Sequence, residues 1–312
     1  MATSKKRIHQ MTIAEWEKAF PDEDACADYL VRHRWSTGVV CPRCGNVLVK
    51  PHGTMRYNWL CNECGQPTNY RFSHITGTVF ENTNKPLRDW FRVIHKMLVS
   101  KKGISALQIF REMGFGSYKT AWYMCMRVRT ALRDKEFKRM MGIVEIDETF
   151  IGGKKGNRHK DKRGMNSDGP KGGAGGKAIV MGAASRTKKT VVARVVENVS
   201  RATVRQFVAQ MCEPKISIIA TDEYPSYKSL SKDLYPRASV DHKAGQYVRY
   251  DHVAGVIHTN TIEGFWSILK RGIIGTYHKV SPKYLPLYVA EFQFRYNNRS
   301  NENIFGEAIK GC

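Results

Sequence analysis

The stretch IVEIDETFIGG, residues 143–153, decides the fold of the second half of the chain. Side chains alternate between the two faces of a β-strand, so Glu145 and Asp147 fall on one face and Val144 and Ile146 on the other. The apolar content predicts a core strand with Asp147 on its less apolar face. A carboxylate there costs desolvation free energy unless it is paired or bound to a metal ion. A salt bridge to a lysine or arginine is the alternative explanation.

The segments after this strand continue an α/β pattern. Further strands are predicted at KAIVMGAAS (177–185), TVVARVVENV (190–199) and KISIIATDE (215–223), and a helix at ATVRQFVAQMC (202–212). Residues 259–298 have a predominantly helical pattern. Three successive strands, then a helix, a strand and more helices, predict a mixed sheet flanked by helices. The predicted fold class is therefore mixed α/β.

Two further acids are candidates for chemistry. Asp222 ends the apolar run ISIIAT, and ligand sites in α/β sheets gather where strands end, although by itself this Asp is only a turn former. Glu263 lies in NTIEGFWSILKRG, a predicted helix in which Lys270, seven residues on, shares its face. Asn260 lies one turn before Glu263 on a similar bearing. A carboxylate facing metal ions, with an ammonium two turns along, suits a phosphodiester. An exposed amphipathic helix with incidental charges is the alternative.

Two cysteine pairs, CPRCG (41–45) and CNECG (61–65), predict a metal-organised module. The second cysteine of one pair and the first of the next enclose positions 45–60, sixteen residues, which is within the range for a four-cysteine zinc site. Four thiolates complete a tetrahedron without an open position, so one structural Zn²⁺ is expected. Two disulfides are disfavoured in a reducing compartment, and a thioredoxin-like redox pair needs only one CxxC. The expected ligands are Cys41, Cys44, Cys61 and Cys64.

The charge balance points to a polyanionic partner. Lysine and arginine outnumber aspartate and glutamate by 51 to 28, for a formal net charge of +23. Nucleic acid is the favoured partner, and a ribosome-associated or merely soluble basic protein is the alternative. The N-terminal residues lack the apolar stretch of a secretory signal, and no later run is long enough to span a bilayer. We therefore expect a cytoplasmic, nucleoid-associated protein without membrane contact.

A helical region precedes the α/β part. Residues 86–134 show helical periodicity broken by GFG, after which Ser117 is a plausible N-cap. The pattern predicts a helix-turn-helix whose second helix offers Tyr118, Lys119 and Arg127 to DNA. An ordinary helical hairpin that links two domains fits equally well.

Residues 152–177, GGKKGNRHKDKRGMNSDGPKGGAGGK, are glycine-rich, basic and almost without apolar side chains. Such a segment cannot bury a core and should be mobile when free. Its place just after the Asp147 strand favours a DNA-contacting arm, and a plain flexible insertion is the alternative. The DNA-binding candidates here and on the Lys270 helix are Lys154, Lys155, Arg158 and Arg271.

Taken together, the motifs resemble the DDE transposases of bacterial insertion sequences, in the group where an N-terminal zinc ribbon precedes a ribonuclease-H-like catalytic domain. The matching stretches are CPRCG, CNECG, VEIDETFIGGK, ATDEYPSY, HTNTIEGFWSILKRGIIGTYHKVSPKYL and EFQFRYNNR, and they follow one another in the expected order. By this resemblance the catalytic acids are Asp147, Asp222 and Glu263, with Lys270 as the helix lysine. Asn260 is a possible alternative to Glu263 as the third ligand.

The resemblance also implies a chemistry and a domain plan. Two Mg²⁺ ions per active site, replaceable by Mn²⁺, would be held by the three acids. The expected domains are an N-terminal helical segment (1–36), a zinc ribbon (37–78), a helical DNA-binding region (79–140) and the catalytic domain (141–312). The expected partners are the terminal inverted repeats and target DNA, with a homodimer or larger assembly in the synaptic complex. A nuclease without strand transfer and a catalytically inactive zinc-ribbon regulator are the alternative functions.

Overall fold

The computed structural model describes residues 12–64, 69–134, 138–153, 176–230, 235–241, 244–252 and 255–312, except for the side chain of residue 216. It comprises two compact units. The first contains Met1–Arg133 and Asn298–Cys312, and the second contains Asp134–Asn297. None of the helices in the described ranges is both long and apolar enough to cross a membrane.

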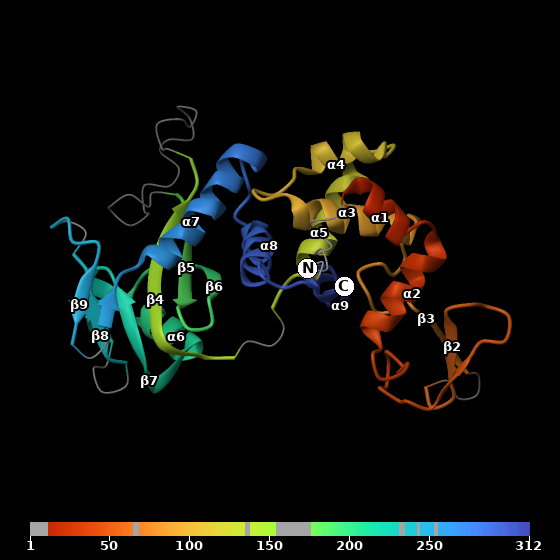
Figure 1. The fold of residues 1–312 in the computed structure, drawn as a ribbon, viewed down its shortest axis with the longest axis horizontal. Coiled ribbons are helices and arrows are strands. Elements are labelled where there is room, and N and C mark those ends of the chain that lie inside the picture. Colours follow the sequence, from red (N-terminus) through yellow and green to blue (C-terminus); the bar gives the residue numbers. More distant parts are fainter. Residues whose placement is uncertain are drawn as a thin grey trace, which may run out of the picture. The chain divides into compact units, whose positions relative to one another are not determined.

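Helices make up most of the first unit (Figure 1). They are α1 (Ile13–Ala19), α2 (Glu23–Arg34), α3 (Leu87–Val99), α4 (Ala106–Met113), α5 (Tyr118–Ala131) and α9 (Ile304–Gly311). α4 ends at Gly114, whose φ of 63° is a left-handed conformation that glycine adopts without strain. α5 begins after Ser117, whose hydroxyl accepts a hydrogen bond from the backbone N–H of Lys119 over 3.2 Å. The two helices, the glycine turn and the N-cap predicted for this region are therefore present.

A small antiparallel sheet in the same unit carries the cysteine pairs. Its strands β1 (Val49–Pro51), β2 (Asn58–Cys61) and β3 (Tyr70–Ser73) are ordered β1-β2-β3. Trp35 and Phe72 pack with the buried Cys41 and Cys61. Because so few apolar side chains form this core, the module depends on the cysteine cluster for its stability.

The C-terminal helix differs from the prediction. The catalytic domain was expected to span residues 141–312, but Asn298–Cys312 belong to the first unit. The reason is an aromatic cluster in which Phe305 of α9 lies 5.3 Å from Phe91 of α3 and 5.6 Å from Tyr29 of α2, between ring centroids. Aromatic pairs at such distances stabilise a core beyond their buried area.

A five-stranded sheet forms the centre of the second unit, with strand order β6-β5-β4-β7-β8. β5 is antiparallel to both β4 and β6, whereas β7 is parallel to both β4 and β8. The prediction of a mixed sheet flanked by helices is confirmed. The strands are β4 (Met140–Ile151), β5 (Ala178–Ser185), β6 (Thr190–Val196), β7 (Cys212–Thr221) and β8 (Arg237–Ser239), and a hairpin of β9 (Arg249–Asp251) and β10 (Gly255–Ile257) follows.

Helices cover both faces of this sheet. α6 (Arg201–Met211) and the 3₁₀ turn η4 (Pro225–Ser229) pack on the face that carries Val144 and Ile146 of β4. α7 (Asn260–Gly272), which continues into the π-helical turn η5 (Ile273–Tyr277), packs with α8 (Leu285–Asn297) on the opposite face. Figure 1 shows α7 crossing β4 and β5. The odd-numbered side chains of β4 therefore face α7, as the alternation predicted.

Candidate active site

Asp147 lies on the face of β4 that α7 covers. Its Oδ2 accepts a hydrogen bond from the indole Nε1–H of Trp266 on α7 over 3.0 Å. Burial, together with the nearby carboxylates of Glu148 and Asp222, raises the pKa of Asp147 to about 7, while hydrogen bonds from the Glu148 backbone and from Trp266 oppose the rise. The site therefore disfavours the charged form of Asp147 until a cation compensates it.

A glycine on β5 makes room for the contact between Asp147 and Trp266. Gly182 is the register partner of Asp147 across the β4–β5 pair. A Cβ on Gly182 would lie 2.6 Å from two carbons of the Trp266 ring and 2.8 Å from Cδ1 of Ile262. Only glycine thus allows the indole to lie against the sheet, where its N–H reaches Asp147.

Asp222 lies beside Asp147 because of the strand register. β4 and β7 are parallel neighbours, and Glu145 pairs with Ala220. Asp147 and Asp222 are each two residues further along, so they lie at the same level on neighbouring strands, with Asp222 just past the end of β7. The Oδ1 of Asp222 accepts a hydrogen bond from the backbone N–H of Tyr224 over 3.1 Å, which orients the carboxylate at the strand end.

Glu148 is a further acid near Asp147 that was not among the predicted catalytic residues, and it lies on the opposite face of β4. Its Oε2 accepts a hydrogen bond from the hydroxyl of the buried Tyr227 over 2.5 Å. Burial raises the pKa of Glu148, the Asp222 charge adds to the rise, and the Tyr227 hydrogen bond counteracts it. Burial, together with Glu148, Asp147 and Asp222, also raises the pKa of Tyr227 well above its usual range, so its phenol stays protonated and donates.

Divalent cations fit this acidic group. Among the described residues, no lysine or arginine side chain forms an ion pair with Asp147, Glu148 or Asp222, which rules out, within those residues, the salt-bridge explanation for Asp147. Carboxylate oxygens are the ligands that hard cations such as Mg²⁺ prefer. A cation would compensate the buried charge of Asp147 and its repulsion by Glu148 and Asp222, the causes of its raised pKa.

Glu263 stands apart from the other acids in its contacts. It lies in the first turn of α7, it is exposed, and its Oε1 accepts a hydrogen bond from the Thr259 hydroxyl over 2.6 Å. Among the described residues, the only group of three or more His, Cys, Asp or Glu with ligand atoms within 4.8 Å of one another is the cysteine cluster. Neither Glu148 nor Glu263 therefore forms so tight a group with Asp147 and Asp222; strand register brings these two aspartates together, and the charges of Asp222 and Glu148 both act on Asp147.

The other candidates on α7 share one face. Asn260, Glu263, Lys270 and Arg271 are all exposed. Their spacing of about one and two turns puts Glu263 and Lys270 on the same side of the helix, as predicted. The opposite side of α7 is buried against the sheet through Ile262, Phe265, Trp266 and Leu269.

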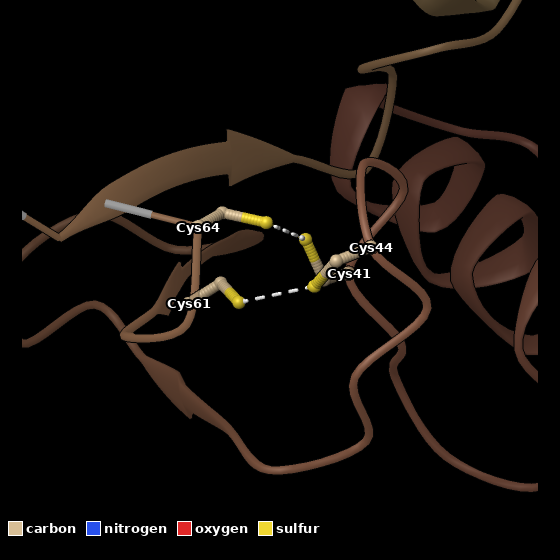
Figure 2. Close-up of side chains that lie close together, drawn as sticks. All are labelled: Cys41, Cys44, Cys61 and Cys64. Atoms are coloured by element: carbon tan, nitrogen blue, oxygen red, sulfur yellow. Dashed lines mark hydrogen bonds between the residues drawn. The ribbon is translucent and has the colours of Figure 1, made fainter. Parts of the chain in front are cut away.

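The four cysteines form a tetrahedral cluster (Figure 2). The sulfur atoms of Cys41 and Cys64 lie 3.8 Å apart, and those of Cys44 and Cys61 lie 3.7 Å apart. A tetrahedron with Zn–S bonds of ~2.3 Å has edges of about 3.8 Å, so the spacing fits Zn²⁺. Disulfides are ruled out, because an S–S bond measures about 2.05 Å and all these cysteines are free.

The residues of α5 that were predicted to contact DNA differ in their exposure. Tyr118 is 46% exposed and Lys119 is also exposed at the start of the helix. Arg127, by contrast, is partly buried, donates a hydrogen bond to the Glu81 carbonyl over 2.8 Å and lies over the Trp90 ring at 5.5 Å. The DNA contact of Arg127 stays a prediction, although part of its guanidinium is already engaged in these contacts. Lys154, Lys155 and Arg158 lie outside the described residues.

Comparison with known proteins connects these features. The ISXO2-like transposase domain matches residues 139–297, which include the whole carboxylate site. The chain belongs to this transposase family. The transposase zinc-ribbon domain matches residues 21–67, which confirms an N-terminal zinc ribbon in front of the transposase domain. The prediction of a DDE transposase with this domain order is confirmed.

Relatives of the transposase support the assignment. A protein of the transposable element ISH50 from Halobacterium salinarum is 30% identical over 287 residues, which cover 89% of this chain and 92% of that protein. A chain in the complex of the simian T-cell lymphotropic virus intasome with the PP2A regulatory subunit B56 gamma is 10% identical. It covers 59% of the transposase and 67% of its own length with a TM-score of 0.28, a likeness too low to inform the fold.

Proposed function

We propose that this transposase cuts DNA at the ends of its insertion sequence and joins the freed 3′-hydroxyl to target DNA, with Asp147, Asp222 and Glu263 holding two Mg²⁺ ions. The proposal rests mainly on one observation, the register of the parallel strands β4 and β7, which puts the buried Asp147 beside Asp222 and contributes to its raised pKa. Bound Mg²⁺ or Mn²⁺ would stabilise the charge on the attacking and leaving oxygens at phosphorus.

Other parts of the protein contact DNA in this proposal. Lys270 engages a phosphate on the exposed face of α7, with Arg271 beside it. The zinc ribbon and the α4–α5 pair bind the terminal inverted repeats, with Tyr118 and Lys119 at the start of α5 as contacts. The net charge of +23 supports such an extended phosphate interface. A homodimer or larger assembly would bring two ends together.

A strand-transfer assay tests the proposal. Purified protein is given a labelled, pre-cut inverted-repeat end with a 3′-hydroxyl, plasmid target and Mg²⁺. Asp147→Asn, Asp222→Asn and Glu263→Gln should each lower the single-turnover rate at least ~100-fold, since supporting residues around a metal already contribute ~10–100-fold. Glu223→Gln, an exposed acid next to Asp222, is the matched control and should retain activity.

The products separate the alternatives. Nicked plasmid without joined product would favour a nuclease, and DNA binding without any metal-dependent cleavage would favour a regulator. If Asn260→Ala abolishes joining while Glu263→Gln does not, Asn260 is the third ligand instead. Full activity of all three acid variants would refute the assignment of the catalytic acids.

A further inference from the structure

Glu145 is a fully buried carboxylate on the same face of β4 as Asp147. Its oxygens contact the side chain of Arg186 at 2.7 Å from Nε and that of His258 at 3.1 Å from Nδ1. They also accept hydrogen bonds from the backbone N–H and the hydroxyl of Thr261, both over 2.8 Å, and from the backbone N–H of Ile262 over 3.0 Å. Burying a carboxylate is costly, and such a dense set of donors offsets that cost.

Arg186 extends this connection to the chain that leads into α7. Its guanidinium, just beyond the end of β5, also donates hydrogen bonds to the carbonyl of Val256 and, over 2.7 Å, to that of His258. One cation therefore links the β4 carboxylate to two backbone groups before the helix. These contacts join residues 41 to 72 positions apart, so they fix tertiary and not local structure.

The N-terminus of α7 depends on this carboxylate. The N-cap residue Thr259 makes no side-chain capping hydrogen bond, and its hydroxyl donates instead to Glu263. Two of the backbone N–H groups in the first turn, those of Thr261 and Ile262, are satisfied by Glu145 from another element. A negative charge at this end also interacts favourably with the helix dipole.

We propose that Glu145 and Arg186 are positioning residues that hold the first turn of α7, and with it Glu263, in place relative to Asp147. Glu145 is two residues before Asp147 on one strand face, and the Ile262 N–H that it binds directly precedes Glu263. Loss of the anchor lets the first turn shift without breaking the apolar packing of α7 further along. The inference rests on the function proposed above for Glu263.

Mn²⁺ binding to the zinc-loaded full-length protein, measured by calorimetry, provides the test alongside single-turnover strand transfer. Glu145→Gln and Arg186→Lys should each raise the Kd for Mn²⁺ by ~10–100-fold, as expected for residues that orient a metal ligand. Thr261→Val removes one hydroxyl donor and keeps both backbone N–H groups, so it should fold and raise the Kd about two- to fivefold. Glu197→Gln, an exposed acid of the same unit, should change nothing.

A double-mutant cycle distinguishes positioning from general destabilisation. If Glu145 acts through Glu263, the Glu145→Gln/Glu263→Gln protein binds Mn²⁺ no more weakly than Glu263→Gln alone. Fully additive losses, or a wild-type Kd for both Arg186→Lys and Thr261→Val, overturn the positioning role while Glu263→Gln still weakens binding. If Glu263→Gln itself leaves Mn²⁺ binding and strand transfer unchanged, the proposed role of Glu263 as a metal ligand fails and the positioning role fails with it.

Discussion

The indole N–H of Trp266 donates a hydrogen bond to Oδ2 of Asp147 over 3.0 Å. Trp266 lies three residues after Glu263 on α7, so one helix supplies both a proposed metal ligand and the donor that orients another. The contact fixes the orientation of the Asp147 carboxylate from the helix side, and the backbone of Glu148 supplies a second hydrogen bond to it. The orientation of the Asp147 carboxylate therefore depends on how α7 packs on the sheet.

Replacing Trp266 with phenylalanine should impair metal binding with little loss of fold. Trp266→Phe keeps an aromatic ring against the sheet but removes the donor to Asp147. Because that hydrogen bond lowers the pKa of Asp147, its loss raises the pKa further and weakens Mn²⁺ binding, by ~10-fold or more. Calorimetric Mn²⁺ titration measures the change. An unchanged Kd with an unchanged melting temperature would show that the contact has no role in the site.

Adding a single methyl group at Gly182 should destabilise the second unit. Gly182→Ala places a carbon 2.6 Å from the rigid Trp266 ring, so the helix or the indole must move. The expected loss in the free energy of unfolding is ~1–3 kcal/mol, as for overpacked cores, and strand transfer should fall with it. Urea denaturation gives the value. The matched control is Gly264→Ala on α7, where a Cβ meets nothing within 4 Å and should stabilise the helix by ~0.5–1 kcal/mol.

The affinity for divalent ions should rise with pH up to neutrality. Without metal, the Asp147 carboxyl has a pKa of about 7, so protons compete with Mn²⁺ below that pH. The raised pKa of Asp147 also makes the stability of the metal-free protein depend on pH. The raised pKa stabilises the metal-free fold at low pH, and this stabilisation is lost as the pH rises from about 4 through 7.

Calorimetry at pH 6 and pH 8 tests this dependence, with a tighter Kd expected at pH 8. Asp147→Asn should bind Mn²⁺ weakly at both values and lose most of the dependence. A wild-type Kd that is independent of pH would contradict the raised pKa of Asp147. Melting temperatures of the metal-free protein provide a second readout, and they should fall between pH 5 and pH 7.

Zinc removal should unfold the ribbon and spare the catalytic sheet. Trp35 and Phe72 are the only large apolar side chains buried in the described part of the ribbon core, with Trp59 and Tyr70 only partly buried, so it cannot compensate for the lost Zn–S bonds. Cys61→Ser should therefore lose the single zinc and the binding of inverted-repeat DNA, as measured by metal analysis and a DNA-binding titration. Cys26→Ala is the control, since burial raises the pKa of Cys26 to about 12 and it lies outside the cluster. Retention of zinc by Cys61→Ser would contradict the four-cysteine site.

Local patterns were sufficient for several features. The spacing of the cysteine pairs predicted the cluster, because two knuckles can bring four thiolates together with little help from the rest of the fold. Ser117 was identified as an N-cap, since capping depends on residues within one turn. The alternation along β4 correctly predicted which side chains share a face with Asp147.

Contacts between residues far apart in the sequence could not be predicted from local patterns. Nothing near Arg127 in the sequence indicates that its guanidinium packs on Trp90, and nothing near α9 indicates that Phe305 packs against Phe91. For Glu145, the strand alternation predicted only a place on the same face as Asp147. Its shared face with Asp147 was the available signal, but its partners are up to 117 residues away.

The order of the helices and strands, the candidate acidic residues and the cysteine cluster of this transposase could be predicted from the sequence. The reason is that periodicity and spacing are properties of neighbouring residues. Only the tertiary structure places Asp147 beside Asp222 and packs Trp266 against Gly182. It also places Glu145 of β4 where its carboxylate caps the N-terminus of α7. Those relationships depend on strand register and helix packing, which arise only when distant segments exclude water from a shared core.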